Sequence, residues 1–142
     1  MDQQLHFLTV ATPDLDAARS FYGGGLGWSP VVDVPDEVIF YQVAPGMLLG
    51  FFLADKFAQD LGLDVAPSPA GVTLSHNVGS PDEARAVVAA MARAGARVLK
   101  QPQESAFGGI LHALVSDPVG VTWEIAHNPG WRILDDGTVS LR

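Results

Sequence analysis

The chain alternates between short β-like apolar runs and two segments with helical spacing. In the second half, one segment repeats apolar residues every three to four positions: Ala84, Val87, Val88, Met91 and Ala92. A weaker pattern of the same kind occurs in the first half, at Leu15, Ala18 and Tyr22. Such spacing places apolar side chains on one face of a helix. The pattern therefore predicts one amphipathic helix in each half.

Similar start signals precede the two helices. Thr12 and Ser80 are each followed by proline and aspartate. A hydroxyl residue can cap the free N–H groups of a helix, and proline is well tolerated at the first helical position. We therefore expect Thr12 and Ser80 to be N-caps. The first helix should run to the glycines that follow Tyr22, and the second to Gly95.

These signals recur at one offset along the chain. Ser80 follows Thr12 by 68 residues (80 − 12 = 68), and Gly95 follows Gly27 by the same number (95 − 27 = 68). The repeat indicates two duplicated modules.

Each helix lies between β-like runs bounded by turn residues. The expected strands cover residues 5–10, 30–34, 38–43 and 47–53 in the first half, and 72–78, 97–100, 110–116 and 121–127 in the second. Both halves therefore have the order β-α-β-β-β. We predict one domain over residues 1–142. It comprises module 1 (about 4–54), a linker (about 55–70) with one helical turn at 56–61, module 2 (about 71–128) and a tail (129–142).

Composition narrows the classes of protein that the chain can represent. Its 142 residues are 48% hydrophobic and 17% charged, which fits one globular domain. The absence of cysteine excludes disulfides, thiolate zinc sites and cysteine nucleophiles. A formal charge of −8 with only 8 Lys+Arg argues against nucleic acid and anionic membrane as partners. Without a basic leader or a long apolar run, we expect a cytoplasmic protein.

Several motifs resemble the vicinal oxygen chelate superfamily, which groups glyoxalases, bleomycin resistance proteins and dioxygenases. They are Phe21-Tyr22 at the end of the first helix, Leu26-Gly27-Trp28 after it, and the Asp-Pro-x-Gly-x-x-x-Glu pattern that ends at Glu124. The resemblance implies an α+β fold in which two tandem βαβββ modules form a half-open mixed-sheet barrel with a central cleft. It also implies a small-molecule ligand in that cleft and a homodimer.

Metal-dependent members of that superfamily use His or Glu on the first and last strand of each module. The last-strand positions match Gly50 in the first module and Glu124 in the second. On the first strands the matching positions are Leu5 or Phe7, and Thr73 or Ser75; none of these is a usual metal ligand.

Two histidines lie close to the first-strand positions. His6 and His76 have the opposite parity, so a register shift would be needed to turn either inward. Glu124 alone remains of the expected ligands, and a catalytic ion needs about three. We therefore predict no cofactor, with a divalent metal as the alternative.

Strand parity also predicts which residues line the cleft. The expected ligand-binding residues are Phe7, Thr9, Gly50, Thr73, Ser75, Asn77, Phe107 and Glu124. Glu124 is the candidate catalytic residue, as a general base; alternatively it binds a ligand, pairs with Thr73 or Ser75, or faces solvent.

Aromatic residues, two histidines and one apolar run have further expected positions. Phe107 and Trp131 can both form the rim of the cleft; we expect this role for Phe107 and prefer for Trp131 a role as an anchor for the tail. His112 can face either side of its strand, and His127 is expected at the surface. The apolar run at residues 51–53 suggests that both faces of this strand are buried, and a subunit interface is one way to bury them.

Three functions remain compatible with these residues. We favour metal-independent binding of a small organic molecule. The alternative is an enzyme, either a metal-dependent lyase, isomerase or dioxygenase, or a general-base enzyme that uses Glu124. A structural or regulatory dimer without a ligand is the third, and an open pocket would count against it.

Overall fold

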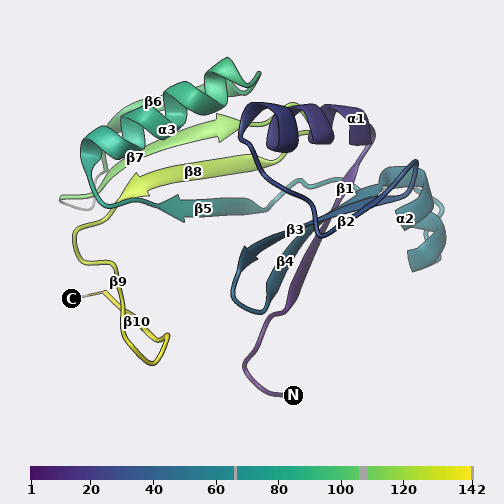
Figure 1. Cartoon of the computed structure of the whole chain (residues 1–142), viewed down its shortest axis with the longest axis horizontal. Coiled ribbons are helices and arrows are strands. Elements are labelled where there is room, and N and C mark those ends of the chain that lie inside the picture. Colours follow the sequence, from purple (N-terminus) through teal and green to yellow (C-terminus); the bar gives the residue numbers. More distant parts are fainter. Residues whose placement is uncertain (66, 106–108, 142) are drawn as a thin grey trace. The chain divides into compact units, whose positions relative to one another are not determined.

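The computed structural model describes residues 1–65, 67–105 and 109–141. The chain divides into two compact units. The first comprises Met1–Val72 and Pro118–Val121, and the second comprises Thr73–Asp117 and Thr122–Arg142. Each unit contains one four-stranded mixed sheet and a helix packed on it (Figure 1).

The two sheets have the same topology. The first contains β1 (Phe7–Thr12), β2 (Val32–Val34), β3 (Val38–Ala44) and β4 (Met47–Leu53), in the order β1-β4-β3-β2. The second contains β5 (Thr73–Asn77), β6 (Arg97–Glu104), β7 (Leu111–Ser116) and β8 (Thr122–His127), in the order β5-β8-β7-β6. In each sheet the first and last strands are parallel and the other pairs antiparallel. The predicted α+β fold with two tandem modules is confirmed.

The helices differ in their regularity. In the first module, α1 (Leu15–Ala18) continues as the π-helix η1 (Arg19–Gly25), where Leu26 N–H donates to Phe21 O at 2.9 Å. The helix passes through Gly23 and Gly24 and ends at Gly25, so the predicted end at the glycines after Tyr22 is confirmed, whereas the π-helix was not predicted. In the second module, α3 spans Pro81–Arg93 without such a change.

Of the two predicted N-caps, the structure confirms one and contradicts the other. Ser80 caps α3, since its hydroxyl accepts from Glu83 N–H at 3.1 Å. In the first module the cap is Asp14, whose carboxylate accepts from Ala17 N–H at 2.9 Å. Thr12 is instead the buried last residue of β1 and bonds the main chain of Asp14. The predicted N-cap at Thr12 was therefore wrong.

The corrected cap also changes the repeat. The two caps differ by 66 residues (80 − 14 = 66), as do the starts of β1 and β5 (73 − 7 = 66). The glycines after the helices keep the offset of 68, because α1 and η1 together have 11 residues (4 + 7) and α3 has 13. The shift of two residues preserves strand parity.

The first module packs around aromatic side chains. Phe21 and Tyr22 from η1 are buried, and the ring of Tyr22 lies against that of Phe51 on β4 with centroids 4.7 Å apart. Phe51 is fully buried in this core, and a subunit interface at residues 51–53 stays a prediction. Phe52 points away from that core, and its ring centroid lies 5.1 Å from that of Phe57. Phe57 belongs to α2 (Ala54–Leu61), which is longer than the single predicted turn.

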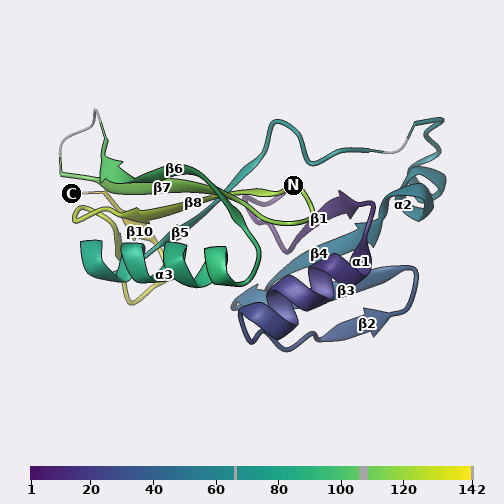
Figure 2. The same ribbon diagram turned by 90° about the horizontal axis from the view of Figure 1, so that it is seen from above.

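The second module buries an aliphatic interface. Figure 2 shows α3 along one face of the second sheet. Ala84, Val88 and Met91 of the helix are buried, as are Ala113, Val115 and Ile125 on β7 and β8. The opposite face of this sheet is free to carry polar groups.

A short hairpin follows β8 that the sequence pattern did not predict. It pairs β9 (Arg132–Ile133) with β10 (Val139–Ser140). None of the described helices is long and apolar enough to cross a membrane.

Candidate functional site

A row of polar side chains crosses the open face of the second sheet. Ser75 on β5 lies opposite Glu124 on β8, and Glu124 lies opposite Leu114 on β7. Paired residues on neighbouring strands share a face, and consecutive residues along a strand point to opposite faces. Ile125, which follows Glu124, therefore points towards α3, while Glu124 points to the open side. His112 shares the open side because it pairs with Ala126, two residues after Glu124.

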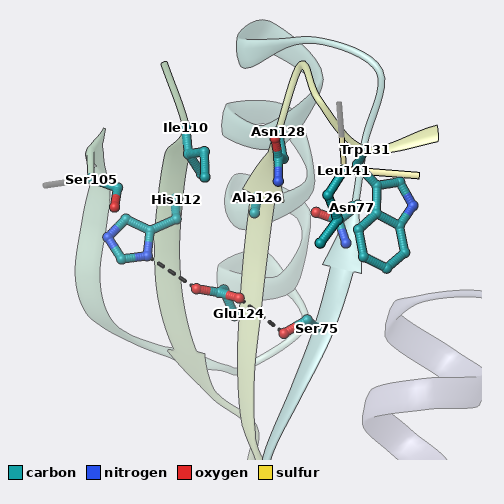
Figure 3. A pocket seen from close by; sticks show the side chains of 10 residues that line it. All are labelled: Ser75, Asn77, Ser105, Ile110, His112, Glu124, Ala126, Asn128, Trp131 and Leu141. Carbon is teal, nitrogen blue, oxygen red and sulfur yellow. Dashed lines mark hydrogen bonds and ion pairs between the residues drawn. The ribbon is translucent and has the colours of Figure 1, made fainter. Parts of the chain in front are cut away.

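Glu124 is held by partners on both sides. Ser75 donates its hydroxyl to Oε2 at 2.9 Å, and His112 Nδ1 lies 3.1 Å from Oε1. The second ring nitrogen of His112 lies 2.8 Å from Nζ of Lys100 on β6. The His112 and Glu124 side chains are 18% and 34% exposed, so they combine partial burial with access from solvent. Figure 3 shows the carboxylate between the imidazole and the hydroxyl.

These residues belong to a pocket of about 570 Å³. Its walls are formed within the second unit by Ser75, Asn77, Ser105, Ile110, His112, Glu124, Ala126, Asn128, Trp131 and Leu141. The volume suits a small organic molecule, and the lining combines apolar surface with a few polar groups, as in most ligand sites.

Three of the predicted ligand-binding residues meet in this pocket: Ser75, Asn77 and Glu124. Thr73 does not line it, and Phe107 lies outside the described residues. Trp131, for which a role as a tail anchor was preferred, is part of the wall (Figure 3).

The histidines occupy different positions. His112 faces the pocket. His127 does not line it, and its Nδ1 lies 3.2 Å from Val78 O.

The remaining wall residues were not singled out from the sequence. Ala126 and Asn128 have the parity of Glu124 and were therefore detectable in principle. Ser105, Ile110 and Leu141 come from outside the regular strands of the sheet. Ile110 lies within the predicted strand 110–116 and has the parity of His112, whereas the approach of Ser105 and Leu141 depends on tertiary folding that strand parity does not describe.

The predicted residues of the first module lie in a different environment. Thr9 is opposite Gly50, and Gly50 is opposite Phe40. Phe7 and Phe40 meet edge to face with ring centroids 4.7 Å apart, and a Cβ at Gly50 would lie 2.5 Å from Cε1 of Phe7. Aromatic rings thus cover the position where the family pattern expects a carboxylate. Thr9 lines a separate, smaller cavity of about 110 Å³ together with Phe57.

The residues present fit a catalytic metal poorly. The described part of the chain contains no group of three His, Cys, Asp or Glu side chains placed to hold an ion. β5 pairs with β8 without a register shift, so His76 lies on the opposite face from Ser75, and His6 is exposed just before β1. Glu124 and His112 are the ionisable donors in the pocket, and both ring nitrogens of His112 already have protein partners.

Comparisons with known proteins place this geometry in context. The family model described as Glyoxalase/Bleomycin resistance protein/Dioxygenase superfamily matches residues 4–125. A glyoxalase-related enzyme from Fulvimarina pelagi is 38% identical, with a TM-score of 0.86 and 97% of each chain covered. A lactoylglutathione lyase from Agrobacterium tumefaciens is 16% identical, with a TM-score of 0.66 and 89% of this chain and 94% of that chain covered; this similarity concerns the fold alone. No curated protein sequence matches.

Proposed function

Because the chain belongs to the Glyoxalase/Bleomycin resistance protein/Dioxygenase superfamily, we propose that it binds a small organic molecule without a complete metal site. The single observation that supports this function is the pocket of about 570 Å³ in the second module, with Glu124 in its wall. The cleft between the modules implied by the resemblance stays a prediction, as does the cytoplasmic location.

The lining indicates the chemistry of the ligand. Glu124 is a hydrogen-bond acceptor, and each of its oxygens keeps lone-pair capacity beyond its bond to His112 or Ser75. Trp131 and Ile110 provide apolar surface in the same pocket. A molecule with an apolar ring and a hydrogen-bond donor satisfies both features, whereas a carboxylate would be repelled by Glu124.

Matched phenyl probes test this function. Benzylamine, benzyl alcohol and benzoate share a ring and differ in the head group. In a titration of ¹⁵N-labelled protein followed by NMR, we expect benzylamine to bind best and benzoate worst, with shifts concentrated at Ser75, Asn77 and Trp131.

A variant of the acceptor supplies the control. Glu124→Gln should weaken benzylamine binding about tenfold, because a charged hydrogen bond contributes about 1.5–3 kcal/mol. Glu37→Gln, in the first module, is the matched control and should change nothing. Equal binding by Glu124→Gln and wild type would refute the proposed site.

The second candidate function is general-base catalysis by Glu124. The observation that favours it is the 3.1 Å contact with His112, which holds a carboxylate at the pocket wall where it can accept a substrate proton. A glyoxalase-type reaction is the first to assay, since the 38% identical protein from Fulvimarina pelagi is described as a glyoxalase-related enzyme. If the protein turns over a substrate, Glu124→Gln should lower kcat by at least about 100-fold. An unchanged kcat would exclude this mechanism.

The metal-dependent alternative has its own test. Calorimetric titration with Zn²⁺, Ni²⁺ and Mn²⁺ should give no stoichiometric binding, because the pocket places too few metal-ligating side chains beside Glu124. One tightly bound ion that is lost in Glu124→Gln would overturn metal independence.

We also propose that the chain forms a homodimer, as implied by the family resemblance. β2 is the edge strand of the first sheet, and the valines in and before it are exposed: Val31, Val32 and Val34. Exposed apolar edges favour pairing with another chain. Light scattering during gel filtration should give twice the mass of the chain, and V32K/V34K should give the mass of one. A wild-type monomer would contradict this proposal.

Dimerisation without any ligand is the less favoured function, because the second module contains an open pocket.

A further inference from the structure

Lys100 lies on the edge strand β6, where irregular pairing decides the direction of its side chain. Val98 pairs with the buried Val115, which faces α3, whereas Lys100 pairs with Leu114. Leu114 is opposite Glu124 and therefore on the open face. Residues two apart share a face in a regular strand. The bulge between Val98 and Lys100 thus turns the lysine to the side of the pocket.

A second irregularity follows directly. The register shifts again between Lys100 and Gln103, and Gln103 pairs with His112. Bulges on both sides of Lys100 therefore set its direction independently of the rest of β6. Edge strands tolerate such bulges because only one neighbour must be matched.

The contacts of Lys100 determine which nitrogen of His112 carries the proton. Nζ of Lys100 lies 2.8 Å from Nε2 of His112. An ammonium group has three donors and no acceptor, so Nε2 must be the accepting nitrogen. The proton of the neutral ring then lies on Nδ1, which donates to Oε1 of Glu124 at 3.1 Å. Lysine, histidine and glutamate thus form one directed chain of hydrogen bonds.

We propose that Lys100 is a positioning residue that fixes the tautomer of His112 and thereby orients Glu124 towards the pocket. Both ring nitrogens of His112 are used by this chain, so the imidazole supports the carboxylate and does not itself bind the ligand. Lys100 does not line the pocket and acts only through His112. The tautomer follows from the geometry alone, whereas its effect on a ligand rests on the function proposed above.

The tautomer is measurable by long-range ¹H–¹⁵N NMR of the histidine side chains. In the wild-type protein at neutral pH, His112 should show a protonated Nδ1 and an unprotonated Nε2, assigned by loss of the signals in His112→Gln. In Lys100→Met the pattern should change to protonated Nε2 or to a mixture, because the donor to Nε2 is gone. Lys100→Arg should restore the wild-type pattern. Lys56→Met, at the chain's other lysine, is the matched control.

Two outcomes would overturn the proposal. One is protonated Nε2 in the wild-type protein, and the other is an unchanged pattern in Lys100→Met. The wild-type spectrum is decisive even if a variant fails to fold, which circular dichroism would reveal.

A binding measurement tests the orientation of Glu124. Benzyl alcohol is the suitable probe, because it is neutral and does not respond directly to the lost charge. Its Kd should rise about two- to tenfold in Lys100→Met, the loss expected for one hydrogen bond, and stay unchanged in Lys100→Arg and Lys56→Met. Wild-type affinity in Lys100→Met would exclude a role in orienting Glu124. Failure of benzyl alcohol to bind the wild-type protein would count against the proposed function, while the tautomer would still decide the role of Lys100.

Discussion

The two modules share one backbone topology, yet their open sheet faces have opposite chemistry. At matching register positions, the first module has the row Thr9, Gly50 and Phe40, and the second has Ser75, Glu124 and Leu114. Aromatic rings cover Gly50, whereas Glu124 is hydrogen-bonded and reachable from a pocket. Equal topology therefore does not imply equal function, since one side-chain position decides which face can receive a polar ligand.

The helix-covered faces, in contrast, are alike. Both are apolar, with Tyr22 against Phe51 in the first module and Val88 and Ile125 buried in the second. The buried centre of such a face favours well-packed apolar residues, because a polar group there needs a partner. The open face has no such constraint, so the difference between the modules is concentrated there.

The largest expected effect comes from giving the first module the group of the second. Gly50→Glu requires its side chain to displace the ring of Phe7, since even a Cβ would lie 2.5 Å from Cε1. Overpacking and a poorly solvated carboxylate should lower the free energy of unfolding by about 2–3 kcal/mol, measured by urea denaturation. Gly24→Glu is the matched control, because a Cβ at Gly24 meets nothing within 4 Å.

A double-mutant cycle sharpens this prediction. In a Phe7→Ala background the nearest ring is gone, so Gly50→Glu should cost less than in the wild-type background. Equal costs in the two backgrounds would show that the aromatic cover does not exclude a carboxylate from the first module.

The second prediction concerns the polar row of the second module. Glu124→Leu leaves the hydroxyl of Ser75 and the imidazole of His112 without their acceptor, and the free energy of unfolding should fall by about 1–2 kcal/mol. The triple variant K100M/H112L/E124L also removes the lysine and the imidazole, and the hydroxyl of the exposed Ser75 can bond water instead, so its stability should return close to that of the wild type. Benzylamine binding should be lost in both. A triple variant less stable than Glu124→Leu would indicate that the row is needed for folding rather than for a ligand.

The sequence predicted those parts of the site that depend on regular strands. Ser75, Asn77 and Glu124 were expected on one face, and they line one pocket, because alternation holds along β5 and β8 without a register shift. Lys100 was missed, since a bulge reverses the parity that the same reasoning would assign to it. The place of Trp131 in the pocket wall was not the preferred interpretation, because the approach of the tail depends on contacts distant in sequence.

The fold, like the site, was predictable where its elements are regular. Turn residues and alternation gave all eight strands of the two sheets. They missed the π-helix and the two-residue change in offset, since the first module places its N-cap two residues later than the motif Thr12-Pro13-Asp14 suggests. Aromatic cover over Gly50 could not be predicted, because it depends on how Phe7 and Phe40 pack across strands.

The third prediction tests the two helix caps. Asp14→Ala and Ser80→Ala each remove a side chain that accepts a main-chain N–H, and each should lower the free energy of unfolding by about 1 kcal/mol. Asp82→Ala is the control, because it removes an acidic residue from the first turn of α3 without removing the cap. A negligible effect of Asp14→Ala would show that the first helix does not depend on this cap.

The smallest expected effect concerns the edge strand of the first module. Lys100 on the edge strand of the second module is turned to the open face, whereas Asp33 on β2 pairs with Ile39, on the face covered by the helix, and binds Arg19 of η1 at 2.7 Å. The Arg19 guanidinium lowers the pKa of the Asp33 carboxyl by its hydrogen bond. Both side chains are about one-third exposed, at 28% and 35%, so solvent screens the pair.

The sign of the pH dependence follows from that shift. The folded state binds the Asp33 proton less tightly than the unfolded state, so the pair stabilises the fold above the ordinary carboxyl pKa and loses its effect as the pH falls through the lowered value. Asp33→Asn should cost less than about 1 kcal/mol at neutral pH, and less still at high salt. The difference from wild type, measured by urea denaturation, should shrink as the pH falls below the ordinary carboxyl pKa, and Asp64→Asn at an exposed position is the control for the change in net charge. A difference that stayed constant with pH would exclude the ion pair as its source, and with it this contrast between the two edge strands.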